Sequence, residues 1–367
     1  MARAPAATVG SRETLSRIGG LLVALAALLA VLLVAVRPWY MTWGATEAER
    51  QSRLPGDEVG FSGRNETRAI AVAAGAAQVF AWVAQLGQDR AGFYSYELLE
   101  DLAGCEMPRV EHLDPQLQRW SVGDKLWMYP PDKLGGMGHA RLLAYEPSHA
   151  LVFGTRVPTD APQAGPSGTW SFVVQATGER SSRLIVRGTG GPTPSLLGSA
   201  FNRTVFEPLH FAMERRMLEG IRDLAEGRTP PTRLYDGAVL ASWTVTFVLF
   251  VASAAAVLLA ARWRRQLAHV IGAGVVFQIL TLLQPPLPIG VLCTLGLLLL
   301  ARPRPSAAKH HSAEPKQELS RALSGSTGSA VAAAEGKEAA PGGADVLSEP
   351  GNASDAVETA SAKLGAR

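Results

Sequence analysis

The sequence predicts an α+β protein in which transmembrane α-helices hold a soluble domain with a curved antiparallel sheet and a long C-terminal helix. Three observations carry this prediction. Apolar residues, 47% of the 367, form uninterrupted blocks on both sides of a polar middle region. That region contains short alternating runs separated by turns, which is typical of antiparallel strands. An amphipathic helical pattern follows, and a curved sheet needs such a helix to cover one face.

Composition limits the function classes. The formal net charge of +3 is too small to predict nucleic-acid binding. Both basic stretches, residues 262–265 and 302–309, adjoin apolar blocks, where a role in membrane topology is the simpler interpretation. Cys293 lies within an apolar block, so we expect no disulfide with Cys105. No Cys/His spacing indicates a metal site, and no fingerprint indicates a cofactor.

The first apolar block covers residues 18–36, a run of 19 uncharged residues after a basic N-terminus at 1–17. As a helix it would be about 28 Å long, close to the roughly 30 Å hydrocarbon core of a bilayer. Trp39 and Tyr40 follow, as in an aromatic belt. The alternative is a cleaved signal peptide, but residues 34–36 before Arg37 make a poor cleavage site. We therefore expect an uncleaved anchor.

Three further blocks predict three more spans, at residues 237–261, 267–283 and 287–301. The first of these has 25 residues without a charge. A proline-rich turn at 284–288 separates the other two blocks, because proline cannot continue a helix interior. The alternative for these two short blocks is a re-entrant or interfacial pair, and the sequence favours four spans.

Charge sets the orientation of these spans. Arginines precede the first span, follow the second and follow the last, and positive residues favour the cytoplasmic side. Four spans put all three groups on one side. We therefore predict a multi-pass cell-membrane protein with cytoplasmic termini and an extracytoplasmic soluble domain. Residues 302–367 lack any apolar period and are predicted to be a disordered tail.

The soluble part begins with a polar connector at 44–66, and the predicted domain covers 67–228. The period of its apolar residues predicts a strand, two helices, five strands and a closing helix. In order, these are 67–73, 76–86, 94–102, 125–129, 138–145, 150–157, 168–175, 183–187 and 204–226. The closing helix carries one apolar stripe, composed of Phe206, Leu209, Met213, Met217, Ile221 and Leu224. This order predicts a helix-grip domain, an arrangement that usually leaves a cavity between helix and sheet.

Three stretches resemble bacterial members of the SRPBCC (START/Bet v 1-like, polyketide cyclase/dehydrase-like) superfamily that are linked to membranes. They are Gln85–Glu100 (QLGQDRAGFYSYELLE), Trp43–Asp57 with its WGAT and LPGD motifs, and Glu207–Arg215 (EPLHFAMER). The resemblance covers about half of the chain and none of the later spans. It implies the helix-grip fold. It implies no single activity, because the superfamily includes lipid carriers, hormone receptors, cyclases and hydroxylase domains.

Two groups of aromatic residues are candidates for ligand contact. Phe93, Tyr94 and Tyr96, with Glu97, follow a Gly-containing turn and could line the opening of a cavity, or could simply seal helices against the sheet. The second group lies on predicted strands and could form an apolar wall or ordinary core; it consists of Trp127, Tyr129, Trp170 and Phe172. His210 and Glu214 share one helix face, which allows acid–base work or a surface pair. We assign no catalytic residue.

The leading functional hypothesis is a membrane-tethered binding module. Its cavity would take an apolar or amphipathic small molecule, such as a lipid or a polyketide-like compound, beside the bilayer. A second hypothesis is a cyclase or dehydratase-type enzyme, which needs two titratable groups converging in the cavity. A third is a structural or assembly protein whose cavity is filled by its own side chains. The volume of the interior distinguishes the third hypothesis from the other two.

Overall fold

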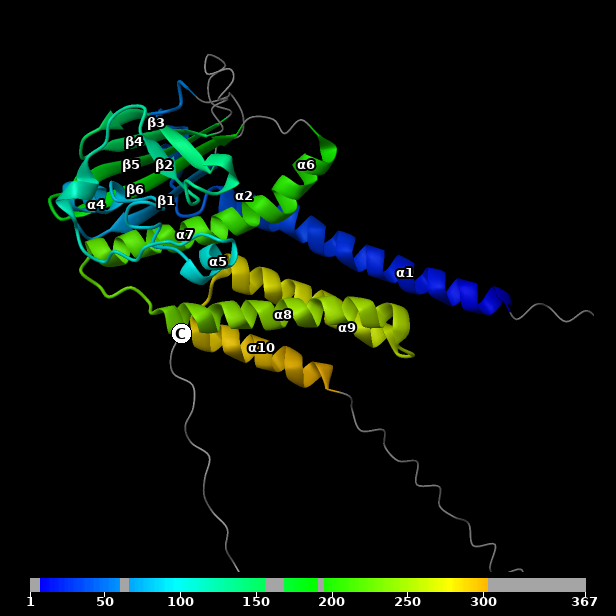
Figure 1. Cartoon of the computed structure of the whole chain (residues 1–367). Helices are drawn as coiled ribbons and strands as arrows, with labels where there is room; N and C mark the ends of the chain where they lie inside the picture. Colours follow the sequence, from blue (N-terminus) through cyan, green and yellow to red (C-terminus); the bar gives the residue numbers. More distant parts are fainter. Residues whose placement is uncertain (1–6, 60–65, 137, 156–167, 191–194, 303–367) are drawn as a thin grey trace, which may run out of the picture. The chain divides into compact units, whose positions relative to one another are not determined.

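A computed structural model describes residues 7–59, 66–136, 138–155, 168–190 and 195–302. The fold is α+β, with one antiparallel sheet and several apolar helices, as the sequence predicts (Figure 1). The predicted tail lies outside the described residues beyond Arg302, and so does the predicted end of the strand at 150–157.

The sheet has six strands in the order β1-β6-β5-β4-β3-β2, all antiparallel. Strands β2 to β6 form the predicted meander, in which each strand pairs with the next, and β1 joins at the edge of β6. The strands are β1 (Glu66–Val72), β2 (Lys125–Trp127), β3 (His139–Glu146), β4 (Ala150–Thr155), β5 (Gly168–Gly178) and β6 (Ser181–Gly190). Short turns between successive runs permit this local pairing, which is why the sequence predicts it.

One face of the sheet packs against helices, and side chains fill the space between. The helices are α4 (Ala76–Val83) and α7 (Glu207–Ala225), whereas α5 (Glu97–Leu102) contacts the later helix α8 (Arg233–Leu259). Two short 3₁₀ turns, η2 (Pro115–Gln118) and η3 (Leu134–Gly136), lie in the connecting segments. Phe172 and Leu184 from the sheet meet Met217 and Ile221 of α7 in one buried cluster. Within the described residues, packed side chains occupy the space where the sequence predicts a cavity.

The predicted polar connector covers the other face of the sheet. Leu54 packs on Val173 and Ile185 in a second buried cluster. A short helix, α3 (Glu47–Gln51), precedes it, and Thr46 caps this helix with a complete capping box. Arg187 of β6 donates to Asp57 at 2.6 Å, which fixes the connector to the sheet. Central strands are therefore buried on both faces.

The closing helix is longer than the sequence predicts. It runs without a break through α6 (Leu196–Phe201), η5 (Asn202–Phe206) and α7, and Ser195 caps its start by accepting from the Gly198 amide. Of the predicted apolar stripe, only the later part is buried against the sheet. Phe206 and Leu209 are exposed, so the prediction that they face the core is wrong.

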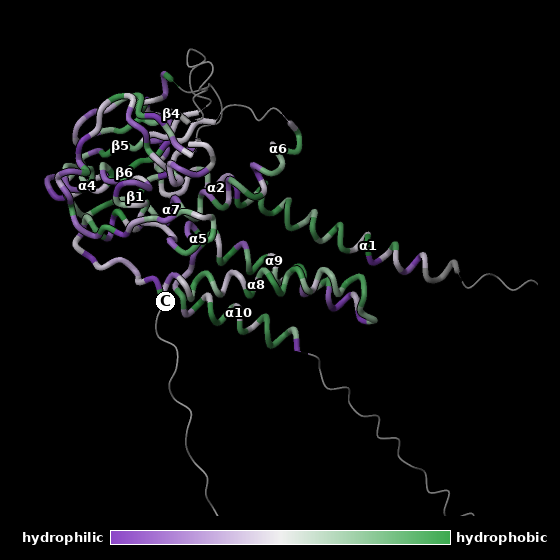
Figure 2. The backbone as a smooth tube through the Cα atoms, viewed as in Figure 1, coloured by the Kyte–Doolittle hydropathy of each residue, from purple (hydrophilic) through white to green (hydrophobic). Residues whose placement is uncertain are grey.

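Three helices of the described residues are long and apolar enough to cross a membrane: Ser11–Met41, Arg233–Leu259 and Trp263–Leu283. Their segments are α1 (Ala7–Ala30), η1 (Val31–Val36), α2 (Arg37–Met41), α8 (Arg233–Leu259), α9 (Trp263–Gln278) and η6 (Ile279–Leu283). A shorter apolar helix, α10 (Leu287–Ala301), follows a turn in which Gln284 adopts a left-handed conformation. Figure 2 shows hydrophobic colouring along most of these helices, with hydrophilic stretches towards their ends.

The basic ends of these helices lie together. Arg17 donates to the Leu258 carbonyl, and Arg265 donates to the carbonyls of Leu300 and Arg302. The start of α1, the end of α8, the start of α9 and the end of α10 therefore share one end of the bundle. The number of spans and their orientation stay predictions.

The opposite end of the bundle packs directly on the soluble domain. Tyr96 meets Trp243 of α8 edge to face, with ring centroids 5.1 Å apart. Arg215 of α7 donates to the Leu282 carbonyl, and Gln284 donates to the Ala212 carbonyl. The domain is thus fixed to the bundle by specific buried contacts rather than by a linker alone.

Candidate functional site

Five side chains with charged or hydrogen-bonding groups gather where α7 crosses the sheet beside the end of the first apolar helix. We call this set the charged cluster; it comprises Glu66, Arg68, Trp170, His210 and Glu214. The sequence analysis names three of these residues, and the other two lie on β1.

Local geometry puts these side chains on facing surfaces. Glu66 and Arg68 are two residues apart on β1, so both point to the same side of the sheet. His210 and Glu214 are one turn apart on α7. Gly188 of β6 lies opposite both Glu66 and Trp170 in the strand register. A Cβ at Gly188 would lie 2.5 Å from Glu66 Oε1, so glycine makes room for this carboxylate.

Arg68 is the centre of the cluster and is fully buried. Its Nη1 donates to Glu214 Oε1 at 2.7 Å, its Nη2 to Glu66 Oε2 at 2.6 Å, and its Nε to the Tyr40 carbonyl at 2.8 Å. Burial alone would lower the pKa of Arg68, but the two carboxylates raise it above its ordinary value. The guanidinium therefore stays charged and joins β1, α7 and the segment that leaves the first apolar helix.

Glu214 is held as a carboxylate. Burial alone would raise its pKa, but Arg68, His210 and the Trp170 indole together lower it below the ordinary value. Trp170 Nε1 donates to Glu214 Oε2 at 3.0 Å, which leaves each carboxylate oxygen with a donor. A buried charge with such partners is stable, whereas the same charge with either partner removed is costly.

His210 is the most accessible member of the cluster. Its Nδ1 lies 3.9 Å from Glu66 Oε1, and its Nε2 lies 3.9 Å from Glu214 Oε2. These distances exceed a direct hydrogen bond. The ring stacks on Phe206, with centroids 5.6 Å apart and planes 14° from parallel. His210 thus connects the buried ion pair to an exposed apolar side chain.

The cluster could in principle hold a metal through Glu66, His210 and Glu214, whose ligand atoms lie within 4.8 Å of one another. Arg68 argues against this use. Its guanidinium already bonds both carboxylates, so a bound cation would face a fixed positive charge at close range. Arg68 occupies one oxygen of each carboxylate, so the residues present fit a metal poorly.

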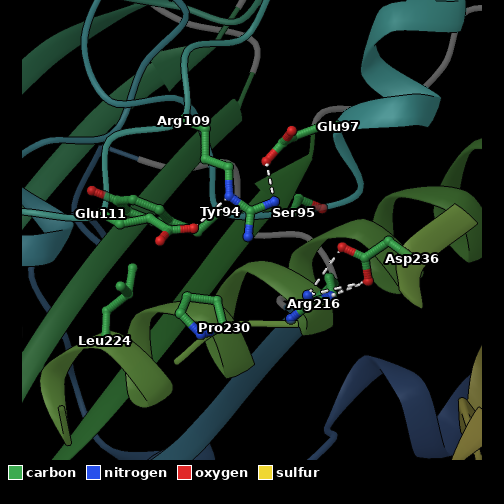
Figure 3. Close-up of a pocket in the computed structure, with 9 residues that line it drawn as sticks. All are labelled: Tyr94, Ser95, Glu97, Arg109, Glu111, Arg216, Leu224, Pro230 and Asp236. Atoms are coloured by element: carbon green, nitrogen blue, oxygen red, sulfur yellow. Dashed lines mark hydrogen bonds and ion pairs between the residues drawn. The ribbon is translucent and has the colours of Figure 1, made fainter. Parts of the chain in front are cut away.

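A second polar site lies between α7, the segment before α5, and the start of α8 (Figure 3). Glu97, Arg109, Arg216 and Asp236 surround it, and Figure 3 shows Arg109 reaching Glu97 while Arg216 reaches Asp236. The cavity at this site has a volume of only about 20 Å³. That is enough for about one or two waters, far below the roughly 300 Å³ of the smallest ligand pockets.

Two of the predicted site residues border this cleft. Tyr94 has a left-handed backbone (φ 54°), and its hydroxyl accepts from Gln85 at 3.3 Å. Burial raises its pKa to about 12, against the opposing effects of Gln85 and Arg90. Glu97 pairs with Arg109 and with Arg233. These two predicted site residues are therefore separate from His210 and Glu214, which belong to the charged cluster.

The aromatic residues predicted to contact a ligand have structural roles. Phe93 stacks on Trp170, and Phe172 lies beside Trp170 in the same buried cluster. Tyr96 is buried against the membrane helices.

On β2 the core-facing residue is Leu126. Trp127 lies outside the buried core and packs on His139, while Tyr129 donates its hydroxyl to the Ala103 carbonyl. Trp127 and Tyr129 are thus half-buried and lie outside the buried clusters of the described residues.

Arg68 and Glu66 are absent from the site residues that the sequence predicts. An arginine at an inward position of a predicted strand is a detectable signal for the first, because a buried arginine requires acidic partners. Glu100 of α5 is buried, and its Oε2 has no hydrogen-bond partner among the described residues. Burial, followed by Glu97 and Asp101, raises the pKa of Glu100 to about 7.

No protein-family model and no curated protein matches the sequence. Solved structures with some similarity include a solution structure of a Thermobifida fusca protein, 16% identical, with a TM-score of 0.30, covering 45% of this chain and 97% of its own. A crystal structure of a Mesorhizobium loti protein is 13% identical with a TM-score of 0.26, covering 45% and 99%. A conserved protein of unknown function from Enterococcus faecalis is 10% identical with a TM-score of 0.25, covering 49% and 84%. Likenesses at these values assign neither fold nor activity, so function must be argued from the geometry above.

Proposed function

We propose that this chain is a membrane-held helix-grip module of the SRPBCC kind that binds an apolar or amphipathic small molecule beside the bilayer. One observation carries the proposal: an exposed apolar helix face adjoins titratable groups. Phe206 stacks on His210, and His210 lies 3.9 Å from both Glu66 and Glu214. An amphipathic molecule has the matching division into a hydrocarbon part and a polar head.

The hydrocarbon part would lie on the surface rather than in the interior. Val205, Phe206 and Leu209 are all exposed on one side of the closing helix. The interior between α7 and the sheet is filled by aromatic and aliphatic side chains within the described residues. We therefore place the contact on the exposed surface at the start of α7 rather than in an internal cavity.

The polar head would lie at His210. Arg68 carries one positive charge and Glu66 and Glu214 one negative charge each, so these three groups have a net charge of −1. Glu66 uses Oε2 for Arg68, and its Oε1 faces the His210 ring. A neutral head that donates hydrogen bonds is therefore favoured over an anionic one.

Native mass spectrometry of the full-length chain, purified in mild detergent, tests this proposal. We expect one bound amphipathic molecule per chain that survives removal of the detergent. His210→Ala should reduce its occupancy at least fivefold. His149→Ala is the matched control, because His149 lies on the β3–β4 turn, bonded to the Val174 carbonyl and paired with Glu146. A wild-type chain without any bound molecule, or an occupancy in His210→Ala equal to that of the wild type, would overturn the proposal.

A second candidate function is a structural or assembly role. The filled interior favours it, and so does the rigid attachment of the domain to the bundle through Arg216 and Asp236, which are 3.2 Å apart. In that case the chain would carry no small molecule. In-cell cross-linking from the exposed face of α6 to another protein, together with a bare chain in the mass spectrum, would favour this function over ligand binding.

A further inference from the structure

In the segment before α7, large apolar side chains face outward and several polar side chains lie on the less exposed side. On α6 and η5 the apolar residues point outward: Leu196 is 93% exposed, Leu197 81% and Phe201 58%. The small and polar residues Ser199 and Asn202 lie on the less exposed side. A helix in water shows the reverse arrangement, with its polar face outward. Figure 2 shows the hydrophobic colouring of α6.

The position of this segment along the first apolar helix explains the inversion. Residues of η5 contact η1, which is the last part of the apolar run before Arg37. Arg37 Nε donates to Glu207 Oε2 at 2.7 Å, which aligns the start of α7 with the first charged residue after that run. Asn202 also donates to Glu207. The C-terminal end of the segment Leu196–Phe206 therefore lies beside the end of the apolar run at residues 18–36.

We infer that Leu196–Phe206 inserts its outward face into the lipid leaflet nearest the soluble domain, as an interfacial helix. Its occupant is the hydrocarbon of the bilayer, because η5 contacts η1, the end of the first apolar run, where Val31 and Val34 are also exposed. Interfacial helices bury an apolar face about 5–10 Å into the boundary between head groups and acyl chains. Arg203 is exposed on the same segment and can extend its guanidinium to the phosphates.

Insertion has a mechanical consequence for the charged cluster. The helix continues without a break from Leu196 into α7. The inserted segment Leu196–Phe206 and the part that carries His210 and Glu214 therefore belong to one continuous helix. The depth of the segment thereby sets the height of His210 relative to the bilayer. This inference does not depend on the proposed ligand, since it concerns the bilayer itself.

Spin-label accessibility in nanodiscs of phosphatidylcholine and phosphatidylglycerol tests the inference. The full-length chain, with Cys105→Ser and Cys293→Ala, would carry one label at Leu197→Cys or at Phe201→Cys. Val122→Cys is the matched control, because Val122 is also largely exposed, at 67%, but lies in the soluble domain before β2. We expect collision with oxygen to exceed collision with a water-soluble nickel chelate at least threefold at 197 and 201. The ratio should be reversed at 122.

Two results would overturn the inference. Labels at 197 and 201 that collide with nickel as readily as the label at 122 would place the segment in water. Spin–spin broadening at 197 or 201 would place it against a second copy of the chain. Neither result bears on whether the detergent-purified chain retains a small molecule, so this inference and the proposed function can fail separately.

Discussion

Arg68 Nη1 on β1 donates to Glu214 Oε1 on α7 across 2.7 Å, and both side chains are buried. This pair joins the edge of the sheet to the closing helix. Through the Tyr40 carbonyl it also joins both to the end of the first apolar helix. The soluble domain and the first apolar helix thus share one buried ionic connection.

Breaking this pair should destabilise the protein strongly. Glu214→Gln leaves the buried Arg68 charge with one carboxylate fewer, at a cost of about 3 to 5 kcal/mol. That corresponds to a fall of roughly 10 °C in the melting temperature followed by tryptophan fluorescence. The double variant Arg68→Met with Glu214→Leu should cost less than the two single changes added together. Additive costs would show that the pair is not coupled.

The pH dependence of stability should report Glu100. Its pKa is raised to about 7 in the folded state from an ordinary 4.5, so the folded state holds the proton more tightly than the unfolded chain. Stability from this group is full below about pH 4.5 and is lost as the pH rises to 7. The loss is on the order of 3 kcal/mol, and it is complete above pH 7.

Glu100→Gln should remove this loss. We expect the variant to melt several degrees above the wild-type protein at pH 8 and at nearly the same temperature at pH 5. Asp101→Asn is a control of the same chemistry on the same helix, since Asp101 pairs with Arg233 and is less buried than Glu100. Equal melting curves for wild type and Glu100→Gln at pH 8 would contradict the raised pKa.

Gly220 should not tolerate a side chain. A Cβ at this position of α7 would lie 2.5 Å from the Tyr94 carbonyl oxygen, and Tyr94 already has a left-handed backbone. Gly220→Ala should therefore cost about 1 to 3 kcal/mol, although alanine normally favours a helix. Gly296→Ala on α10 is the control, because no atom lies within 4 Å of the added Cβ. Equal stability of both variants would show that α7 does not need this close approach.

The predicted topology can be read by labelling single cysteines in intact cells with a maleimide that cannot cross membranes. Both native cysteines, Cys105 and Cys293, are free and would first be replaced. Glu179→Cys lies in the tight turn between β5 and β6 and should react from outside. Ser306→Cys follows the last apolar helix and should react only after permeabilisation. The opposite pattern would invert the orientation of all four predicted spans.

Much of the architecture follows from local patterns. Hydropathy alone predicts the apolar helices, because the length and composition of a run such as residues 18–36 are properties of that segment by itself. Alternation and short turns predict the meander for the same reason. The capping box at Thr46 is also a local pattern, but the residues of this segment by themselves predict only a polar connector. Its role in covering the sheet depends on Leu54 meeting strands more than 90 residues away.

The sequence by itself determined that this protein has apolar helices around an α+β domain, and it identified His210 and Glu214 as a pair on one helix face. Only the tertiary structure decided that the interior is filled and that Arg68 completes the charged cluster. Arg68 and Glu214 are 146 residues apart, and their meeting depends on how α7 crosses β1. The physical reason is that helix and strand periods are set by neighbours in the chain, whereas buried charges must find their partners across it.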